Sequence, residues 1–237
     1  MKLIKIINQV LKKFNAQIVR HPSPDITRRL KIMNYYKINK VIDVGANVGN
    51  YSKELFQLGY NGQIISFEPL SSAFKKLKDN SKSNSKWSVF NCALGDFDGK
   101  HEINISENSD SSSLLPMLPD HLNSAPDSKY ISKEEIEVKK LDTIFDEITN
   151  HTDNIYLKID TQGFEKSVLN GAISSIKKIK AIQIELSIIP LYESSFNYKD
   201  LMNFLEQNGF KLVSIENGFS NPLTGELLQF DGVFIRQ

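Results

Sequence analysis

The sequence predicts an α/β fold built around a largely parallel β-sheet. Three observations indicate this fold. After residue 40, short apolar runs alternate with helical segments, glycines close several of these elements, and the first apolar run ends in a glycine-rich turn that leads into a helix. Strands that alternate with helices are joined by right-handed crossovers, which keep neighbouring strands parallel.

The predicted elements follow one another in a regular order. Apolar runs of strand length predict strands at 40–44, 63–67, 87–91, 155–159, 181–186, 211–215 and 227–235. Helical spacing predicts helices at 50–58, 71–80, 165–177 and 198–208. Because helices separate most of these strands, the pattern predicts consecutive strand–helix–strand units.

Two further segments interrupt this order. Residues 102–105 and 135–139 alternate polar and apolar side chains, which predicts an exposed antiparallel pair of strands. Between them lies a stretch rich in Ser, Asn and Pro, residues 106–132, called here the 106–132 insertion. Loops of this length in a compact domain usually carry function, so we expect the insertion to close over a bound acceptor.

Residues 1–40 are expected to form a basic helical arm, separate from a domain at 41–237. The arm holds ten Lys or Arg residues and one acid, Asp25, although the whole chain has a net charge of +1. In residues 1–20 apolar residues recur at helical spacing and lysines interrupt them, unlike a secretory signal. We expect a helix that packs on the domain or on a second copy in a homodimer. The alternatives are peripheral contact with an anionic membrane through residues 1–20, and nucleic acid.

The composition excludes several classes of protein. The 237 residues, 40% apolar and 24% charged, suit one globular domain. A single cysteine, Cys92, excludes an internal disulfide framework and a zinc site made of cysteines. No stretch approaches the roughly 20 apolar residues of a membrane span. Without an export signal, we expect a cytoplasmic protein.

The glycine-rich turn, residues 43–49 (DVGANVG), carries the strongest functional signal. Glycines let the backbone approach a ligand, and the helix that follows offers free N–H groups. Asp43, just before the turn, would repel a pyrophosphate and attract a cation. Glu68, at the end of the second predicted strand, can accept both hydroxyls of a ribose. Together they predict a site for a nucleoside with a cationic tail, such as S-adenosylmethionine (SAM).

Several short motifs then follow in order: residues 43–52 (DVGANVGNYS), 67–69 (FEP), 93–96 (ALGD), 138–142 (VKKLD), 158–165 (KIDTQGFE) and 184–186 (IEL). In this order they resemble the FkbM family of SAM-dependent methyltransferases, from about residue 40 to the C-terminus. The resemblance implies a class I methyltransferase fold, which is Rossmann-like, with seven mostly parallel strands, the last one antiparallel, and helices on both faces. It also implies O-methylation of a hydroxyl on a small molecule or glycan. Gln162 departs from the family, which commonly has glutamate there.

The resemblance also implies which residues contact the cofactor. Those around its methionine part would be Asp43, Gly45, Asn47 and Gly49. Glu68 would hold the ribose, and the residues along the adenine would be Asn91, Cys92, Ala93 and Leu94. Ser111 and Ser112 of the 106–132 insertion would approach from the opposite side.

Two acids are candidates for the chemistry at the acceptor. A hydroxyl is a weak nucleophile until a base or a metal draws off its proton. Asp160 and Glu185 end adjacent predicted strands, so both should reach the sheet edge where ligands bind. We expect a general base and an orienting group, with Asp160 also beside the cofactor and Lys158 as an ionic partner. The alternatives are a divalent cation such as Mg²⁺ held by the two acids, and His121 of the insertion as the base.

Two other functions remain open. An NAD-dependent oxidoreductase would use the same glycine-rich turn, but Asp43 and the absence of a Tyr-x-x-x-Lys pair disfavour it. A non-catalytic SAM-binding scaffold protein would keep the fold and lose the chemistry. Methylation of nucleic acid is not expected, because the sequence has no Asn-Pro-Pro-Tyr-like signature.

Overall fold

A computed structural model describes residues 2–18 and 21–237 of the chain. Within these residues, one seven-stranded sheet has the order β3-β2-β1-β7-β8-β10-β9. Its strands are β1 (Lys40–Val44), β2 (Gln63–Phe67), β3 (Trp87–Phe90), β7 (Ile155–Ile159), β8 (Ile179–Ser187), β9 (Phe210–Glu216) and β10 (Gln229–Arg236). The last strand, β10, runs antiparallel to both β8 and β9, whereas β3, β2, β1, β7 and β8 are parallel. The predicted fold class is confirmed.

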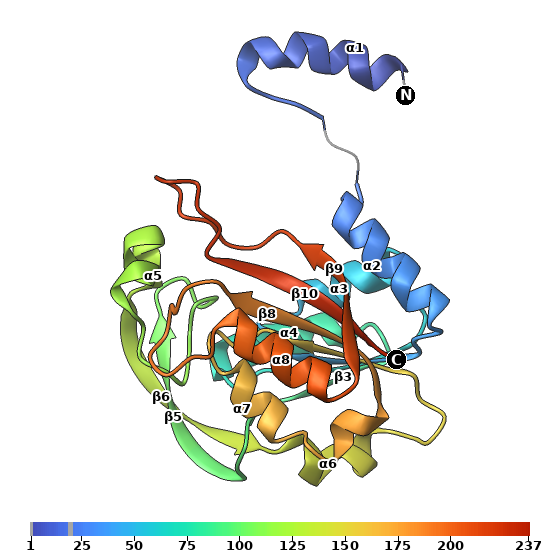
Figure 1. Ribbon diagram of the computed structural model, residues 1–237, viewed down its shortest axis with the longest axis vertical. Coiled ribbons are helices and arrows are strands. Elements are labelled where there is room, and N and C mark those ends of the chain that lie inside the picture. Colours follow the sequence, from blue (N-terminus) through green and yellow to red (C-terminus); the bar gives the residue numbers. More distant parts are fainter. Residues whose placement is uncertain (1, 19–20) are drawn as a thin grey trace.

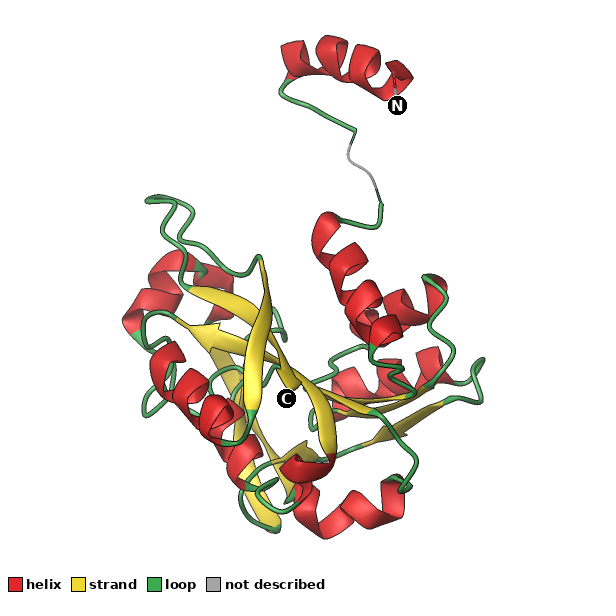
Figure 2. Ribbon diagram, turned by 45° about the vertical axis from the view of Figure 1, so that its right-hand side comes forward, coloured by secondary structure: helices red, strands yellow, loops and turns green. Residues whose placement is uncertain are grey.

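Helices cover both faces of this sheet (Figure 2). Their bounds are α2 (Pro24–Tyr35), α3 (Asn50–Gln57), α4 (Ser71–Ser81), α6 (Leu141–Ile148), α7 (Glu165–Asn170) and α8 (Tyr198–Gln207). Buried side chains of α6, α7 and α8 share one apolar cluster with one face of the sheet. Those of α2, α3 and α4 form a second cluster on the other face. The α2 helix lies within the predicted helical arm, whereas α6 has no counterpart in the sequence prediction.

The register of the three central strands positions the site. Val44, the last residue of β1, lies beside Phe67 of β2 and Ile159 of β7. The chain turns from β1 toward β2 on one side, and β7 lies on the other. The next residues after these strands, Gly45, Glu68 and Asp160, therefore meet at a topological switch point, where ligands bind in sheets of this kind.

The prediction of a helix at 165–177 is wrong for the second half of that range. The α7 helix ends at Asn170, and a separate 3₁₀ turn, η3, spans Ser175–Lys178. Gly171 lies between them and packs directly on the backbone of Gly95. A Cβ atom at residue 171 would lie 1.7 Å from the carbonyl oxygen of Gly95. This close packing bends the chain where apolar spacing alone predicted a continuous helix.

A small second sheet flanks the main one. It contains β4 (Ala93–Leu94), β5 (Gly99–Ser106) and β6 (Tyr130–Lys139) in the order β4-β6-β5. The antiparallel pairing of β5 with β6 confirms the predicted exposed pair. The 106–132 insertion between them holds α5 (Pro119–Ser124), the 3₁₀ turn η2 (Pro126–Ser128) and the start of β6. Isolated bridges join the insertion to β5 through Asn104 and Ser113, and to Tyr192 through Met117.

The N-terminal arm has two different halves. The α1 helix (Lys2–Leu11) and the 3₁₀ turn η1 (Lys12–Phe14) stand apart from the rest of the chain (Figure 1). In contrast, α2 packs on the domain, with Met33 in its core and the guanidinium of Arg29 in a buried ion pair with Glu216 of β9. Part of the predicted arm, Met1, Val19 and Arg20, lies outside the described residues. Among the described helices, none has the length and apolarity needed to cross a bilayer.

Candidate functional site

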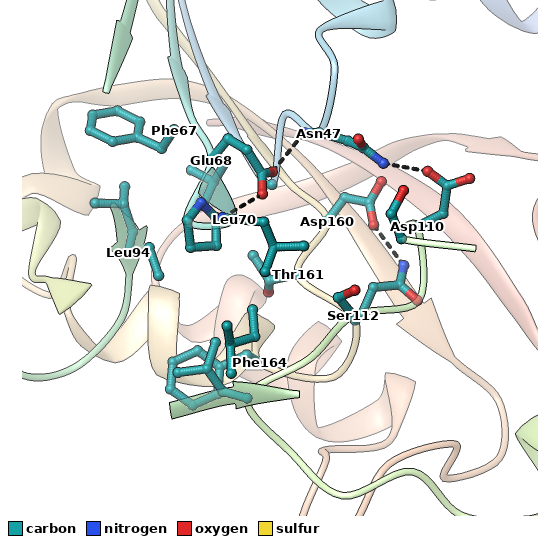
Figure 3. Close-up of a pocket in the computed structure, with 18 residues that line it drawn as sticks. Asn47, Phe67, Glu68, Leu70, Leu94, Asp110, Ser112, Asp160, Thr161 and Phe164 are labelled. Atoms are coloured by element: carbon teal, nitrogen blue, oxygen red, sulfur yellow. Dashed lines mark hydrogen bonds between the residues drawn. The ribbon is translucent and has the colours of Figure 1, made fainter. Parts of the chain in front are cut away.

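A pocket opens at the carboxyl ends of β1, β2 and β7 (Figure 3). Its cavity volume is about 230 Å³. Its apolar wall consists of Val44, Phe67, Pro69, Leu70, Ala93, Leu94, Ile103, Leu114 and Phe164. Its polar wall consists of Gly45, Asn47, Glu68, Ser109, Asp110, Ser112, Asp160, Thr161 and Gln162.

The glycine-rich turn forms the base of the pocket. Gly45 has φ +75°, and a Cβ atom there would lie 1.8 Å from the carbonyl oxygen of Asp160. Only glycine allows this approach between the ends of β1 and β7. Asn47 also has a positive φ, +47°, and its backbone N–H donates to Glu68 at 2.8 Å. The turn therefore joins the ends of three strands.

Asn47 offers the pocket an unused acceptor. Its side-chain Oδ1 is buried and has no hydrogen-bond partner among the described residues. Its Nδ2 donates to the carboxylate of Asp110, which belongs to the 106–132 insertion. A buried acceptor without a donor is costly.

Glu68 is a buried carboxylate, 5% exposed, at the end of β2. Its two oxygens accept from the backbone N–H groups of Asn47, at 2.8 Å, and Leu70, at 2.9 Å. Burial raises the pKa of Glu68 to about 7, although the two backbone donors lower it. Glu68 is thus fixed in place and titrates near neutral pH.

The 106–132 insertion closes one side of the pocket. It contributes Ser109, Asp110, Ser112 and Leu114 to the wall. The hydroxyl of Ser113 donates to the backbone carbonyl of Gln162 at 2.6 Å, which attaches the insertion to the turn after β7. The insertion therefore contacts the turns that follow both β1 and β7.

The pocket is acidic. Three carboxylates line it, those of Glu68, Asp110 and Asp160. Among the described residues in its wall there is no Lys, Arg or His. A pocket lined by three carboxylates, of which, within the described chain, Asp160 alone pairs with a cation, Lys158, behind the wall, favours a positively charged ligand and disfavours a phosphate.

Asp160 and Glu185, the two acids predicted for the chemistry, are joined by Gln162. The Nε2 of Gln162 donates to Asp160 Oδ1 at 2.9 Å and to Glu185 Oε2 at 3.3 Å. Asp160 lines the pocket with 40% of its side chain exposed. Glu185 lies behind it, outside the pocket wall, and also accepts from Gln229 Nε2 at 2.8 Å. Burial, followed by the nearby charges of Asp160 and Glu165, raises the pKa of Glu185 well above its usual range.

Asp43 does not line the pocket. Its carboxylate lies beneath the glycine-rich turn, where Oδ2 accepts from Ser52 at 2.9 Å and Ser66 at 3.2 Å. Lys158, its neighbour on β7, places Nζ 3.3 Å from Asp43 Oδ1 and 3.4 Å from Asp160 Oδ2. Lys158 therefore balances the charge that the sequence analysis assigned to the pocket, and the pocket's acidity comes from other residues.

The other predicted cofactor residues divide into two groups. Those that the structure brings to the pocket wall are Gly45, Asn47, Glu68, Ala93, Leu94, Ser112 and Asp160. Those that it places outside the wall are Gly49, Asn91, Cys92 and Ser111. Gly49 is the N-cap of α3 and packs against Trp87, while Asn91 donates to the carbonyls of Glu68 and Pro69. Cys92 is a core residue, and Ser111 is buried against Ser128.

His121 is not placed to act as the base. It lies on α5, 3% exposed, with its ring 5.1 Å from that of Tyr192 and 5.6 Å from that of Phe219. Burial lowers the pKa of His121 to about 4. No metal centre emerges either: within residues 2–18 and 21–237, no three His, Cys, Asp or Glu side chains are placed to hold an ion.

Sequence reasoning missed several residues that shape the site. Asp110 lies in a polar stretch whose neighbours gave no sign that one acid would face the pocket. Tyr192 donates to Gln162 Oε1 at 2.9 Å from a segment 30 residues away. Gln162 was identified only as a departure from the family, although it contacts both acids. Only Ser111 and Ser112, beside Asp110, gave a usable signal.

Comparisons with known proteins identify a family. A family model described as the methyltransferase FkbM domain matches residues 43–212. One similar structure is a methyltransferase FkbM from Methylobacillus flagellatus, with 16% identity and a TM-score of 0.47, covering 82% of this chain and 43% of that one. Another is an rRNA methylase from Streptococcus thermophilus, with 9% identity and a TM-score of 0.48, covering 93% of this chain and 99% of that one. The chain spans less than half the length of the first, and no curated protein matches it.

Proposed function

The chain belongs to the FkbM methyltransferase family, and we propose that it transfers a methyl group from SAM to a hydroxyl of a small molecule or glycan. The observation that carries this proposal is the charge of the pocket. Its described lining residues include three carboxylates and no cationic side chain. Such a pocket suits a cationic nucleoside, and it opposes both a dinucleotide pyrophosphate and the phosphates of a nucleic acid.

The residues of the pocket fit SAM in their chemistry. Glu68 would accept from the ribose hydroxyls, and the apolar wall beside Leu94 would receive the adenine. The buried Oδ1 of Asn47, which lacks a donor among the described residues, would accept from the ammonium of the methionine part. When bound, SAM supplies a methyl group on a positively charged sulfur, which is open to in-line attack.

Asp160 is the group best placed to take the proton of the acceptor. It is the more exposed of the two linked acids, and it lines the pocket at the end of β7. Gln162 holds its Oδ1 and Lys158 holds its Oδ2, so the carboxylate is fixed before an acceptor arrives. Fixed positioning supplies much of the acceleration of such a transfer, and a base within hydrogen-bond reach supplies the rest.

Glu185 is proposed as an orienting residue. Its pKa is raised by burial, so its charged form is disfavoured beside Asp160. Its oxygen accepts from Gln162 and Gln229, which fixes the Gln162 amide against Asp160. Asp160 then carries the proton transfer while Glu185 sets its geometry.

A two-part experiment tests the function. In calorimetric titrations we expect SAM to bind and NADH to show no binding; binding of NADH without SAM would overturn the proposal. The protein is then incubated with methyl-labelled SAM and pools of sugars and hydroxylated small molecules, followed by mass spectrometry. Label on a hydroxyl oxygen supports O-methylation. Label found only on nitrogen, carbon or RNA contradicts the acceptor class while leaving the cofactor assignment intact.

A further inference from the structure

The α1 helix and the η1 turn present an apolar face that no described part of the chain covers. Ile6, Val10 and Phe14 follow at intervals of four residues, which places them along one side of the helix. Their exposed fractions are 59%, 56% and 75%. Ile4 is exposed as well. A continuous exposed row of large apolar side chains marks an interaction surface.

The charge around this face has one sign. Residues 2–13 contain four lysines, and the first acid of the chain is Asp25. Lys12 and Lys13, immediately before Phe14, are both exposed. A helix with an apolar face and lysines as its only charges is complementary to an anionic surface that has an apolar interior.

A second copy of the chain is a poorer partner for this face. Thirteen helical residues span about 20 Å, so a face about 10 Å wide covers roughly 200 Å². A stable protein interface needs about 800 Å² from each partner. Pairing two such helices would also bring lysines of the same charge together. A bilayer has neither restriction, because its area is unlimited and its headgroups supply the opposite charge.

We propose that α1 and η1 lie in the surface of an anionic lipid membrane, with Ile6, Val10 and Phe14 in the acyl region and Lys12 and Lys13 at the phosphates. Residues 15–23 join them to α2, which the buried Arg29–Glu216 pair fixes to the domain. Nine residues span at most about 30 Å. Membrane binding would therefore hold the catalytic domain within that distance of the bilayer.

The test uses the full chain and sedimentation with vesicles of phosphatidylcholine, with or without about one quarter phosphatidylglycerol. We expect binding to the anionic vesicles only, weakened by raising the salt from about 0.1 M to about 0.5 M. Combined Lys12→Gln and Lys13→Gln should weaken it about 25-fold, since each lysine near the surface contributes about fivefold. Combined Ile6→Gln, Val10→Gln and Phe14→Gln should abolish it.

Matched controls separate the face from general surface effects. Lys75→Gln with Lys76→Gln removes two exposed lysines from α4, and Leu223→Gln removes an apolar side chain that is 88% exposed. Both controls should bind like the unaltered chain. SAM titration of every variant should give an unchanged Kd, which keeps this result independent of the proposed function.

Three results would overturn the membrane proposal. The first is no binding of the unaltered chain to anionic vesicles at low salt. The second is a dimer, seen by sedimentation equilibrium, that the triple glutamine variant converts to a monomer. The third is tight binding to an RNA duplex that depends on Lys12 and Lys13 but not on the apolar face.

Discussion

Two carboxylates on either side of β1 occupy equivalent places and have different surroundings. Glu68 and Asp160 are each the first residue after a strand that neighbours β1. Glu68 is buried and accepts from two backbone N–H groups, whereas Asp160 is 40% exposed and is held by the side chains of Gln162 and Lys158. The sheet therefore sets where each acid stands, while the loops around it set how exposed the acid is and which groups hold it.

The sharpest test of this comparison removes the exposed carboxylate. Asp160→Asn is expected to lower kcat by about 10²- to 10⁴-fold, the contribution of a positioned general base. Because Glu68 and Asp110 remain in the pocket, the Kd for SAM should change by less than about tenfold. Single-turnover transfer and calorimetry measure the two quantities.

Asp146→Asn, an exposed acid on α6, is the matched control and should leave both quantities unchanged. If Asp160→Asn kept most of its turnover, Asp160 would not be the base. If the unaltered chain bound SAM and transferred nothing to any acceptor, the scaffold alternative would gain support instead.

A change in the turn between the two acids should have the next largest effect. Gly45→Ala would place a Cβ atom 1.8 Å from the carbonyl oxygen of Asp160 in a backbone with φ +75°. We expect a loss of about 3 kcal/mol in the free energy of unfolding, together with weaker SAM binding. Urea denaturation and titration measure these effects.

Gly59→Ala provides the comparison for Gly45→Ala. Gly59 has φ +91° and no atom within 4 Å of its would-be Cβ. Gly59→Ala should therefore lower the free energy of unfolding by the conformational strain alone, about 1–2 kcal/mol. Equal losses at the two positions would show that the contact between Gly45 and Asp160 contributes nothing.

The ionisation of Glu68, the buried acid, should make SAM binding depend on pH. The pKa of Glu68 is raised to about 7, so its ionised fraction rises about tenfold between pH 6 and pH 8. If SAM needs the ionised form, its association constant should rise by a similar factor over this range. Because the folded-state pKa lies above the unfolded value, Glu68 also contributes stability at low pH that is lost as the pH rises from about 4.5 to about 7.

Glu68→Gln is the control for the pH dependence. It should weaken SAM binding at pH 8 and remove most of the rise between pH 6 and pH 8. A rise that persists in Glu68→Gln would assign the titration to another group of the pocket.

The smallest expected effect concerns the insertion. Asp110→Asn should weaken SAM binding about two- to fivefold at low salt, because an exposed charge contributes little. The effect should shrink as salt screens it. Asp127→Asn, an exposed acid in the same insertion, should have no effect on SAM affinity. Equal SAM affinities of the two variants would show that Asp110 does not contribute to SAM binding.

The parts of the molecule that follow local rules were predictable from the sequence. The central strands, the glycine-rich turn and Glu68 depend on runs of a few residues, and they appear where the sequence placed them. The prediction of a continuous helix at 165–177 was wrong because Gly171 packs on Gly95, a contact between positions far apart in the chain. The register of β1 against β7 likewise decides that Lys158 faces Asp43, and no local pattern encodes that register.

The residues of the candidate site divide in the same way, into those set by local sequence and those set by tertiary packing. The residues on the turns after β1 and β2 were found, whereas the role of Gln162 depends on Asp160, Glu185 and Tyr192 meeting around it. Asp110 faces the pocket only because the insertion attaches to Asn47 and to the turn after β7. Tertiary packing, rather than sequence spacing, brings these groups together.

The position of α2 has a practical consequence. The β9 strand is the outermost of the sheet, with β10 on one side, and Arg28 of α2 donates to the carbonyl of Ile215 and the hydroxyl of Ser214 on β9. An edge strand with free backbone groups recruits strands from other molecules. A truncated protein that began at residue 38, just before β1, would lose α2, and we expect its exposed β9 edge to cause aggregation. A truncated protein that began at residue 21 would keep α2. Arg28 would then still cover the β9 edge and oppose strand pairing between molecules.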